Sequence, residues 1–167
     1  KFNPTRIKYL RKQIDAHFNK DENSIKPYTD LDILDIGCGG GLVCEPLNRL
    51  GGKVTGIDAS EKNINIAITH AAQSNLDIEY LPVTAESLVQ KKKQYDVVLA
   101  LEIIEHVTNP AAFIASCTKL VKPDGLLIFS TLNRTAKSYA LGIIAAEYIL
   151  RWVPQGTHEW KKFLKPS

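Results

Sequence analysis

Three side chains capable of metal binding and acid–base chemistry stand close together in the middle of the chain, at Glu102, Glu105 and His106. Their spacing of i, i+3 and i+4 would put all three on one face of a helical turn. Two carboxylates and an imidazole on one face can hold a divalent cation; the oxygens favour Mg²⁺ or Mn²⁺, and the imidazole also suits Zn²⁺. Without a metal, the same stretch would be a solvated acidic turn, with His106 either a general base or an ordinary loop residue.

A glycine-rich stretch, LDIGCGGGL at 34–42, predicts a turn that a ligand can approach closely. Glycines permit positive φ and let a ligand touch the main chain. A dinucleotide is the obvious candidate, but the pattern G-x-G-x-x-G fails, because Gly37 and Gly39 fit while Leu42 takes the place of the third glycine. The simpler interpretation is a tight strand-to-helix turn.

Two acidic residues beside this turn favour a nucleoside as the ligand. Asp58 ends the next expected strand, about 20 residues after Gly37, where a carboxylate can accept hydrogen bonds from both ribose hydroxyls. Its alternative role is to cap the helix that follows at Ser60. Asp35 lies just before the turn, either as a cation-binding carboxylate beneath it or as a loop anchor. These residues predict a bound ribose, with no pyrophosphate required.

Short apolar runs that alternate with amphipathic stretches would position these residues. Five runs are typical of strands buried on both faces: Leu31–Ile36, Lys53–Ile57, Ile78–Leu81, Tyr95–Ala100 and Gly125–Ser130. Four stretches have a helical pattern: Leu42–Leu50, Ser60–Ser74, Ala111–Leu120 and Ser138–Trp152. The alternation predicts right-handed βαβ units and an α/β fold with a doubly wound, mostly parallel sheet. Ligands of such sheets bind beyond the carboxyl ends of the strands, where the glycine turn is expected.

Composition limits the function classes further. With 167 residues, 44% of them hydrophobic and 23% charged, the chain reads as one ordinary globular domain. A net charge of +3 with scattered lysines gives no broad nucleic-acid footprint, so no nucleic-acid partner is expected. Three cysteines without paired or metal-type spacing suit reduced thiols in a cytosol or mitochondrial matrix. The chain contains no methionine and stops just after an apolar stretch, which suggests a fragment of a longer protein.

Several stretches resemble known motifs. LDIGCGGG, GIDAS, QYDVVLALEIIEHV and LVKPDGLLIFSTLNR are similar to the successive motifs of class I S-adenosylmethionine-dependent methyltransferases, which have a Rossmann-like fold. More narrowly, NPTRIKYL near the start and STLNRTAKSYALGIIAAEYILRWVPQGTHEWKKFLKP at the end resemble the ubiquinone-biosynthesis O-methyltransferases. The resemblance covers nearly the whole chain.

The resemblance implies a role for each matching position. Gly37 would approach the methionine portion of S-adenosylmethionine, Asp58 would hold the ribose, and the stretch 84–86 would lie at the adenine. The full expected cofactor-binding set is Arg6, Asp35, Gly37, Gly39, Asp58, Ala85, Glu86 and Leu101. The expected ligands of a divalent cation are Glu102, Glu105 and His106, and His106 is also the candidate catalytic base.

The resemblance also implies a reaction, which is methylation of a catechol-type hydroxyl on a lipophilic polyprenyl catechol or demethylubiquinol. A cation on adjacent oxygens would lower the phenol's pKa and orient it, whereas His106 could take the proton directly. Two other functions stay open. RNA 2′-O-methylation is one, because some small-RNA methyltransferases also use a Glu-x-x-Glu-His set, although the weak charge opposes it. The other is a non-catalytic S-adenosylmethionine-binding scaffold in a biosynthetic complex, which the intact Glu-x-x-Glu-His set opposes.

The apolar segment at 138–152, within the basic stretch 133–167, bears on location. It is too short and too interrupted to cross a bilayer, which needs roughly 20 apolar residues. Basic residues flank it, so it could lie in an anionic membrane surface, cap a lipophilic substrate pocket, or pack as a core helix. We therefore expect peripheral membrane contact, in a bacterial cytoplasm or on the matrix face of the mitochondrial inner membrane.

Overall fold

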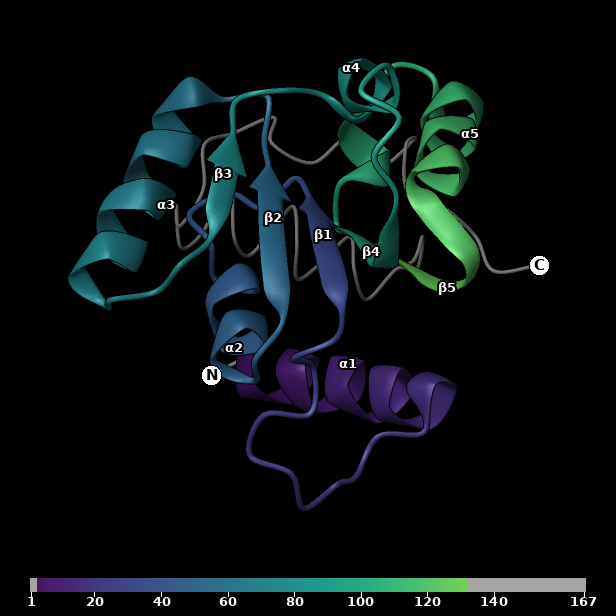
Figure 1. Ribbon diagram of the computed structural model, residues 1–167. Coiled ribbons are helices and arrows are strands. Elements are labelled where there is room, and N and C mark those ends of the chain that lie inside the picture. The colour runs from purple at the N-terminus through teal and green to yellow at the C-terminus, as the bar shows by residue number, and fades with distance from the viewer. Residues whose placement is uncertain (1–2, 132–167) are drawn as a thin grey trace, which may run out of the picture.

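The computed structural model describes residues 3–131, which form a five-stranded parallel sheet with helices on both faces (Figure 1). The strands are β1 (Asp32–Ile36), β2 (Lys53–Ile57), β3 (Glu79–Leu81), β4 (Tyr95–Leu101) and β5 (Val121–Ser130). The helices are α1 (Asn3–Phe18), α2 (Cys44–Arg49), α3 (Glu61–Gln73), α4 (Ala85–Val89) and α5 (Pro110–Leu120), with a short 3₁₀ turn, η1, at Ile104–His106. The strand order β3-β2-β1-β4-β5 confirms the predicted doubly wound parallel sheet.

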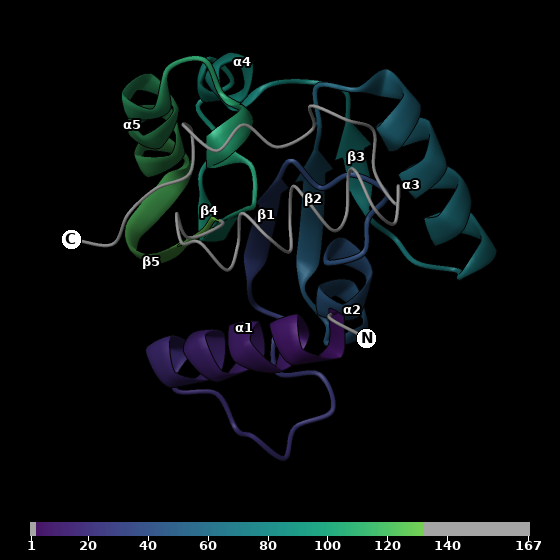
Figure 2. The same cartoon turned by 180° about the vertical axis from the view of Figure 1, so that it is seen from behind.

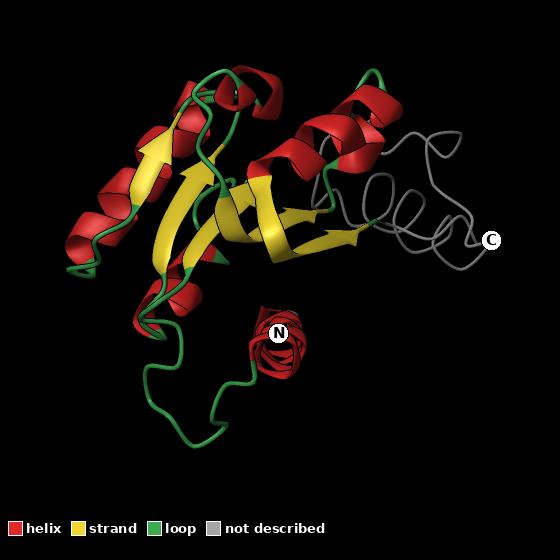
Figure 3. Ribbon diagram, turned by 45° about the vertical axis from the view of Figure 1, so that its right-hand side comes forward, coloured by secondary structure: helices red, strands yellow, loops and turns green. Residues whose placement is uncertain are grey.

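Each face of the sheet carries its own apolar core, because the side chains of a strand alternate between the two faces. Ile33 of β1 belongs to the core shared with α1, α2 and α3, whereas its neighbour Leu34 belongs to the core shared with α4 and α5. Figure 3 shows the strands as a layer between these helices. In Figures 1 and 2, α1 lies at the end of the molecule opposite to α4 and α5.

The strand β1 occupies the centre of the sheet, hydrogen-bonded to β2 on one side and β4 on the other. In this register Asp35 lies between Gly56 and Leu99, one residue before β1 ends. All five strands run in the same direction, so the segments that follow β1, β2, β3 and β4 meet along one edge of the sheet. Most of the expected site residues lie in those segments, whereas Asp35 and Leu101 lie in the last residues of β1 and β4, and Arg6 lies in α1.

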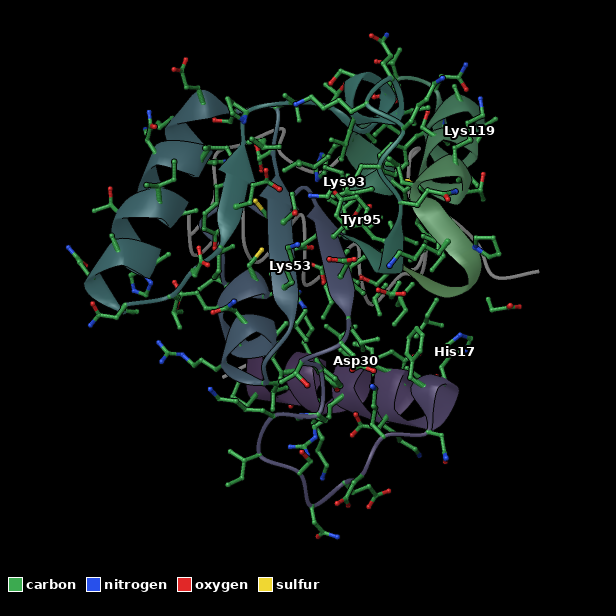
Figure 4. The ribbon with its side chains drawn as sticks, in the orientation of Figure 1. His17, Asp30, Lys53, Lys93, Tyr95 and Lys119 are labelled. Carbon is green, nitrogen blue, oxygen red and sulfur yellow. The ribbon has the colours of Figure 1, made fainter. Side chains whose placement is uncertain are left out.

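Helix α1 is anchored at its carboxyl end. His17 Nε2 donates to the carbonyl oxygen of Asp124 at 2.9 Å, which ties the end of the helix to β5 (Figure 4). Asp15, on the last turns of α1, is buried and accepts a hydrogen bond from the Tyr28 hydroxyl at 2.9 Å. Lys20 Nζ, just beyond the helix, pairs with Asp30. These contacts fix the carboxyl end of α1 against the sheet and the loop that leads to β1.

One lysine of the basic run at 91–93 is engaged within the domain. Lys93 Nζ lies 3.1 Å from Glu79 Oε2 and 5.1 Å from the centroid of the Tyr95 ring (Figure 4). Within residues 3–131, no helix is long and apolar enough to cross a membrane. The segment expected at 138–152 lies outside the described residues.

Candidate active site

The glycine-rich turn follows β1 as predicted and is held against the end of β2. The amide groups of Gly37 and Cys38 both donate to the carbonyl oxygen of Ile57, at 2.8 and 3.0 Å. Gly37 has a φ of +75°, a conformation that an L side chain adopts only at a cost of about 1–2 kcal/mol. A Cβ at Gly37 would also lie 2.7 Å from Cδ1 of Ile103. The glycine therefore allows the loop after β4 to approach the turn.

Asp58 connects the same turn to the start of α3. Its Oδ2 accepts a hydrogen bond from the Gly39 amide at 3.0 Å, and its Oδ1 accepts one from the Ser60 amide at 2.8 Å. The N-cap of α3 is Ser60, whose own Oγ accepts from the Asn63 amide. An ionised carboxylate offers about four acceptor positions, so Asp58 keeps capacity for a ligand hydroxyl while two main-chain donors hold its orientation.

A pocket of about 170 Å³ lies at the carboxyl ends of the strands, where the sequence predicts the cofactor. Four expected cofactor residues line it, namely Gly37, Asp58, Ala85 and Glu86. The last two belong to the first turn of α4, whose N-cap Thr84 accepts a hydrogen bond from the Ser87 amide. The rest of its wall is largely apolar and includes Ile36, Ile57, Val83, Ile103, Val107 and Phe113. An apolar slot with a carboxylate at one side suits an adenine base attached to a ribose.

Asp35, a further expected cofactor residue, lies beneath the turn and does not line this pocket. Its side chain is buried and accepts a hydrogen bond from Cys44 Sγ at 3.3 Å. Burial raises the pKa of Asp35 to about 7, and the nearby Asp58 carboxylate acts in the same direction. The Cys44 hydrogen bond and the Arg6 guanidinium act against this rise. Two roles were expected for Asp35, a cation-binding carboxylate or a loop anchor, and these contacts fit the loop anchor.

Arg6 and Leu101, also expected at the cofactor, lie beside the pocket without lining it. Arg6 Nη2 donates to Glu102 Oε1 at 2.7 Å, so the first turns of α1 contact the segment after β4. Asn3 Nδ2 donates to the carbonyl oxygen of Leu42 at 2.9 Å, which brings the start of α1 against the glycine turn as well. Leu101 ends β4 and is half-buried against the core that α1 shares.

The expected arrangement of Glu102, Glu105 and His106 on one helical face is wrong. Glu102 has a φ of +54° and precedes the 3₁₀ turn, so it is not part of a helix with the other two. Glu105 is buried and accepts a hydrogen bond from Thr131 Oγ1 at 3.1 Å, whereas His106 is exposed. Within residues 3–131, no three His, Cys, Asp or Glu side chains gather closely enough to hold a metal ion. Their role as metal ligands stays a prediction.

Sequence reasoning did not identify the apolar wall of the pocket. Ile103 and Val107 flank His106 in the chain, and Phe113 comes from the first turn of α5. One signal could have identified the first two, since apolar residues that flank a polar motif after a buried strand also face the ligand edge of the sheet. Phe113 carries no comparable signal, because a helix that packs on the sheet buries such residues in any case.

The fold and the site together define a class of protein. Residues 34–129 match the family model described as a methyltransferase domain. Among solved structures, the plantazolicin methyltransferase in complex with a desmethyl analogue and SAH superposes with a TM-score of 0.71, at 21% identity over 90% of this chain and 54% of that one. Coclaurine N-methyltransferase superposes with a TM-score of 0.62, at 18% identity over 76% of this chain and 35% of that one. The fold is that of the class I, Rossmann-like methyltransferases.

Comparison with curated proteins narrows the class to a family. The ubiquinone biosynthesis O-methyltransferase of Bartonella tribocorum is 53% identical over 99% of this chain and 67% of its own length. The protein of the same name from Caulobacter vibrioides is 55% identical over 99% of this chain and 66% of its own length. The chain belongs to the ubiquinone biosynthesis O-methyltransferase family and spans about two thirds of the length of these relatives. It is an S-adenosylmethionine-dependent O-methyltransferase.

Proposed function

We propose that this enzyme transfers the methyl group of S-adenosylmethionine to a catechol-type hydroxyl of a polyprenylated ubiquinone precursor. The observation that carries the proposal is the pocket itself, where Gly37, Asp58, Ala85 and Glu86 come together from three strand ends. The substrate class rests on the relatives, which are named for ubiquinone biosynthesis. Because a polyprenyl chain partitions into a bilayer, we also propose peripheral contact with a membrane.

The chemistry requires deprotonation of the acceptor more than activation of the donor. A sulfonium already carries a good leaving group, whereas a phenol is a weak nucleophile until it loses its proton. In the proposed step the phenolic oxygen attacks the methyl carbon while the bond from carbon to sulfur breaks. The sulfonium becomes a neutral thioether, and the phenolic proton passes to the base. Atoms and charge balance without any further reactant.

His106 is the proposed base. It is exposed at the end of η1, and the pocket-lining residues Ile103 and Val107 lie on either side of it in the chain. This position suits a group that meets an acceptor at the rim of the cofactor pocket. An imidazole can take up a proton near neutral pH, as the reaction needs.

Binding of a divalent cation remains a proposal, and no step of the proposed reaction depends on it. Glu102 is engaged by Arg6, and Glu105 is buried against Thr131, so these residues do not fit a shared ion in this arrangement. If Glu102, Glu105 and His106 did converge, they would supply hard oxygen ligands and an imidazole, and the ion would add Lewis acidity. The proposed reaction is therefore written with the side chains of the protein alone.

The direct test is methyl transfer to a short-chain prenyl catechol, followed as the methylated product. The negative control is the same molecule with one hydroxyl already methylated and the other removed, which should give no product. Product from the catechol would support the proposal. Binding of the cofactor without any transfer to the catechol would contradict the proposed acceptor.

Replacing His106 with asparagine is expected to lower turnover by about 100-fold, the lower end of what a general base supplies. Affinity for S-adenosylhomocysteine should stay unchanged, because His106 does not line the cofactor pocket. Single-turnover rates and calorimetric titration would measure the two quantities. Equal turnover in the variant and the parent would remove His106 from the reaction.

Removal of divalent cations is expected to leave S-adenosylhomocysteine affinity unchanged, since none of the three expected metal ligands lines the pocket. Turnover after chelation then distinguishes two ways of removing the phenolic proton, which are activation of the phenol by a bound cation and direct proton transfer to His106. If turnover is lost and Mg²⁺ restores it, the cation activates the acceptor, whereas undiminished turnover in metal-free protein leaves His106 as the base. A cofactor affinity that falls with chelation would contradict the expectation.

A further inference from the structure

The contact between Arg6 and Glu102 joins two segments that both lie against the glycine turn. Arg6 belongs to α1, which contacts the turn through Asn3 and the Leu42 carbonyl. Glu102 directly precedes Ile103, which contacts Gly37 and lines the cofactor pocket. The ion pair therefore lies beside the wall of the pocket formed by Gly37 and Ile103.

The pair contributes little to stability. The side chains of Arg6 and Glu102 are 33% and 48% exposed, and ion pairs at that exposure contribute little to folding stability. The φ of +54° at Glu102 is a left-handed conformation that is unfavourable for a residue with a side chain. Its amide donates to the Ser130 carbonyl at 2.8 Å, which holds the backbone in this conformation. A strained residue whose ion pair barely offsets the strain is typical of a functional site.

The positive charge of Arg6 affects the site beneath the glycine turn as well as Glu102. Arg6 is close enough to the buried Asp35 beneath the glycine turn to favour the ionised form of that carboxyl group. A guanidinium binds a carboxylate through two parallel hydrogen bonds, and S-adenosylmethionine ends in an α-carboxylate. Arg6 lies near Gly37, because its partner Glu102 directly precedes Ile103, whose side chain lies against Gly37. A carboxylate tail that leaves the nucleoside pocket past Gly37 would therefore be within reach of Arg6.

We propose that Glu102 is a built-in competitor for the cofactor, holding Arg6 until the α-carboxylate of S-adenosylmethionine replaces it. The exchange substitutes one carboxylate for another on Arg6, so little free energy is needed. It releases Glu102 four residues before His106, at the rim where the acceptor is expected. The inference rests on the proposed placement of the cofactor and adds a role for an acidic residue that does not line the pocket.

The competition has an unusual consequence, which is that removing a charge should tighten binding. We expect Glu102→Gln to bind S-adenosylhomocysteine roughly two- to fivefold more tightly than the parent, the range that a part-exposed ion pair spans. Affinity for 5′-methylthioadenosine, which lacks the amino-acid tail, should not change. Arg6→Ala should weaken S-adenosylhomocysteine binding, and in that background Glu102→Gln should have no further effect. Calorimetric titration of the four proteins completes the cycle.

Glu79→Gln is the matched control, because it breaks another part-exposed pair, with Lys93, at the start of the outermost strand β3. It should leave both affinities unchanged, and thermal melts would verify that every variant is folded. Unchanged or weaker binding by Glu102→Gln would overturn the inference, weaker binding indicating that Glu102 meets the cofactor's ammonium group. If Asp58→Ala also left binding unchanged, the placement of the cofactor itself would be at fault.

Discussion

Replacing Asp58 with alanine is expected to weaken S-adenosylmethionine binding by about 2–4 kcal/mol, or roughly 30- to 800-fold in Kd. The carboxylate lines the pocket and should accept hydrogen bonds from the ribose hydroxyls. Its orientation is set in advance, because the Gly39 and Ser60 amides donate to its two oxygens. Alanine would remove the ribose contacts and also release the link between the glycine turn and α3.

Two variants separate these effects. Asp58→Asn keeps one acceptor oxygen and nearly the same shape, so its affinity should fall between those of the parent and Asp58→Ala. Asp30→Ala removes an exposed carboxylate that pairs with Lys20 far from the pocket and should leave affinity unchanged. Calorimetric titration with S-adenosylhomocysteine measures all three. Parental affinity in Asp58→Ala, with a normal melting transition, would remove the ribose assignment.

The strands could be predicted closely because buried parallel strands are continuous apolar runs, and the observed β2 has the predicted bounds, Lys53–Ile57. The prediction was less accurate for the start of β5 and for the short helix α4. The strand β5 begins at Val121, four residues earlier than expected, because 121–124 includes Lys122, Pro123 and Asp124, which do not read as a strand. Helix α4 has only five residues, too few for a helical period to be visible in the sequence.

Only part of the candidate site could be predicted from the sequence. Residues at strand ends could be placed together from the sequence, because parallel strands bring their carboxyl ends to one edge, as seen for Gly37, Asp58 and Ala85. The pair between Arg6 and Glu102 spans 96 positions of the chain and depends on how α1 packs, which no local pattern encodes. The helical face expected for Glu102 failed because its backbone adopts a positive φ, which only tertiary contacts can hold in a glutamate.

The second large effect is expected at Asp35, whose conversion to asparagine should stabilise the domain above neutral pH. Burial raises the pKa of Asp35 to about 7, well above its value of 3.8 in an unfolded chain. The native state therefore keeps the proton between these two pH values while the unfolded state loses it. The contribution of this group to stability is complete below about pH 4 and is lost as pH rises toward 7, by about 4 kcal/mol in all.

Asparagine is neutral throughout this range, so the variant should lack that part of the pH dependence. Near pH 4 the parent and Asp35→Asn should be similar, since both carry a neutral side chain that can accept from Cys44 Sγ. At pH 8 the variant should be more stable by about 2–4 kcal/mol, as measured by urea denaturation across the series. Asp30→Asn serves as the control, because Lys20 lowers the pKa of that exposed carboxyl, so its contribution to stability changes only in acid and the slope between pH 4 and 7 should stay parental. A parental slope between pH 4 and 7 in Asp35→Asn would show that the buried carboxyl does not hold its proton. The stabilised variant would instead assign the ionised Asp35 a destabilising role beneath the cofactor turn, where the hydrogen bond from the Cys44 thiol and the charge of Arg6 favour the ionised form but do not overcome the effect of burial.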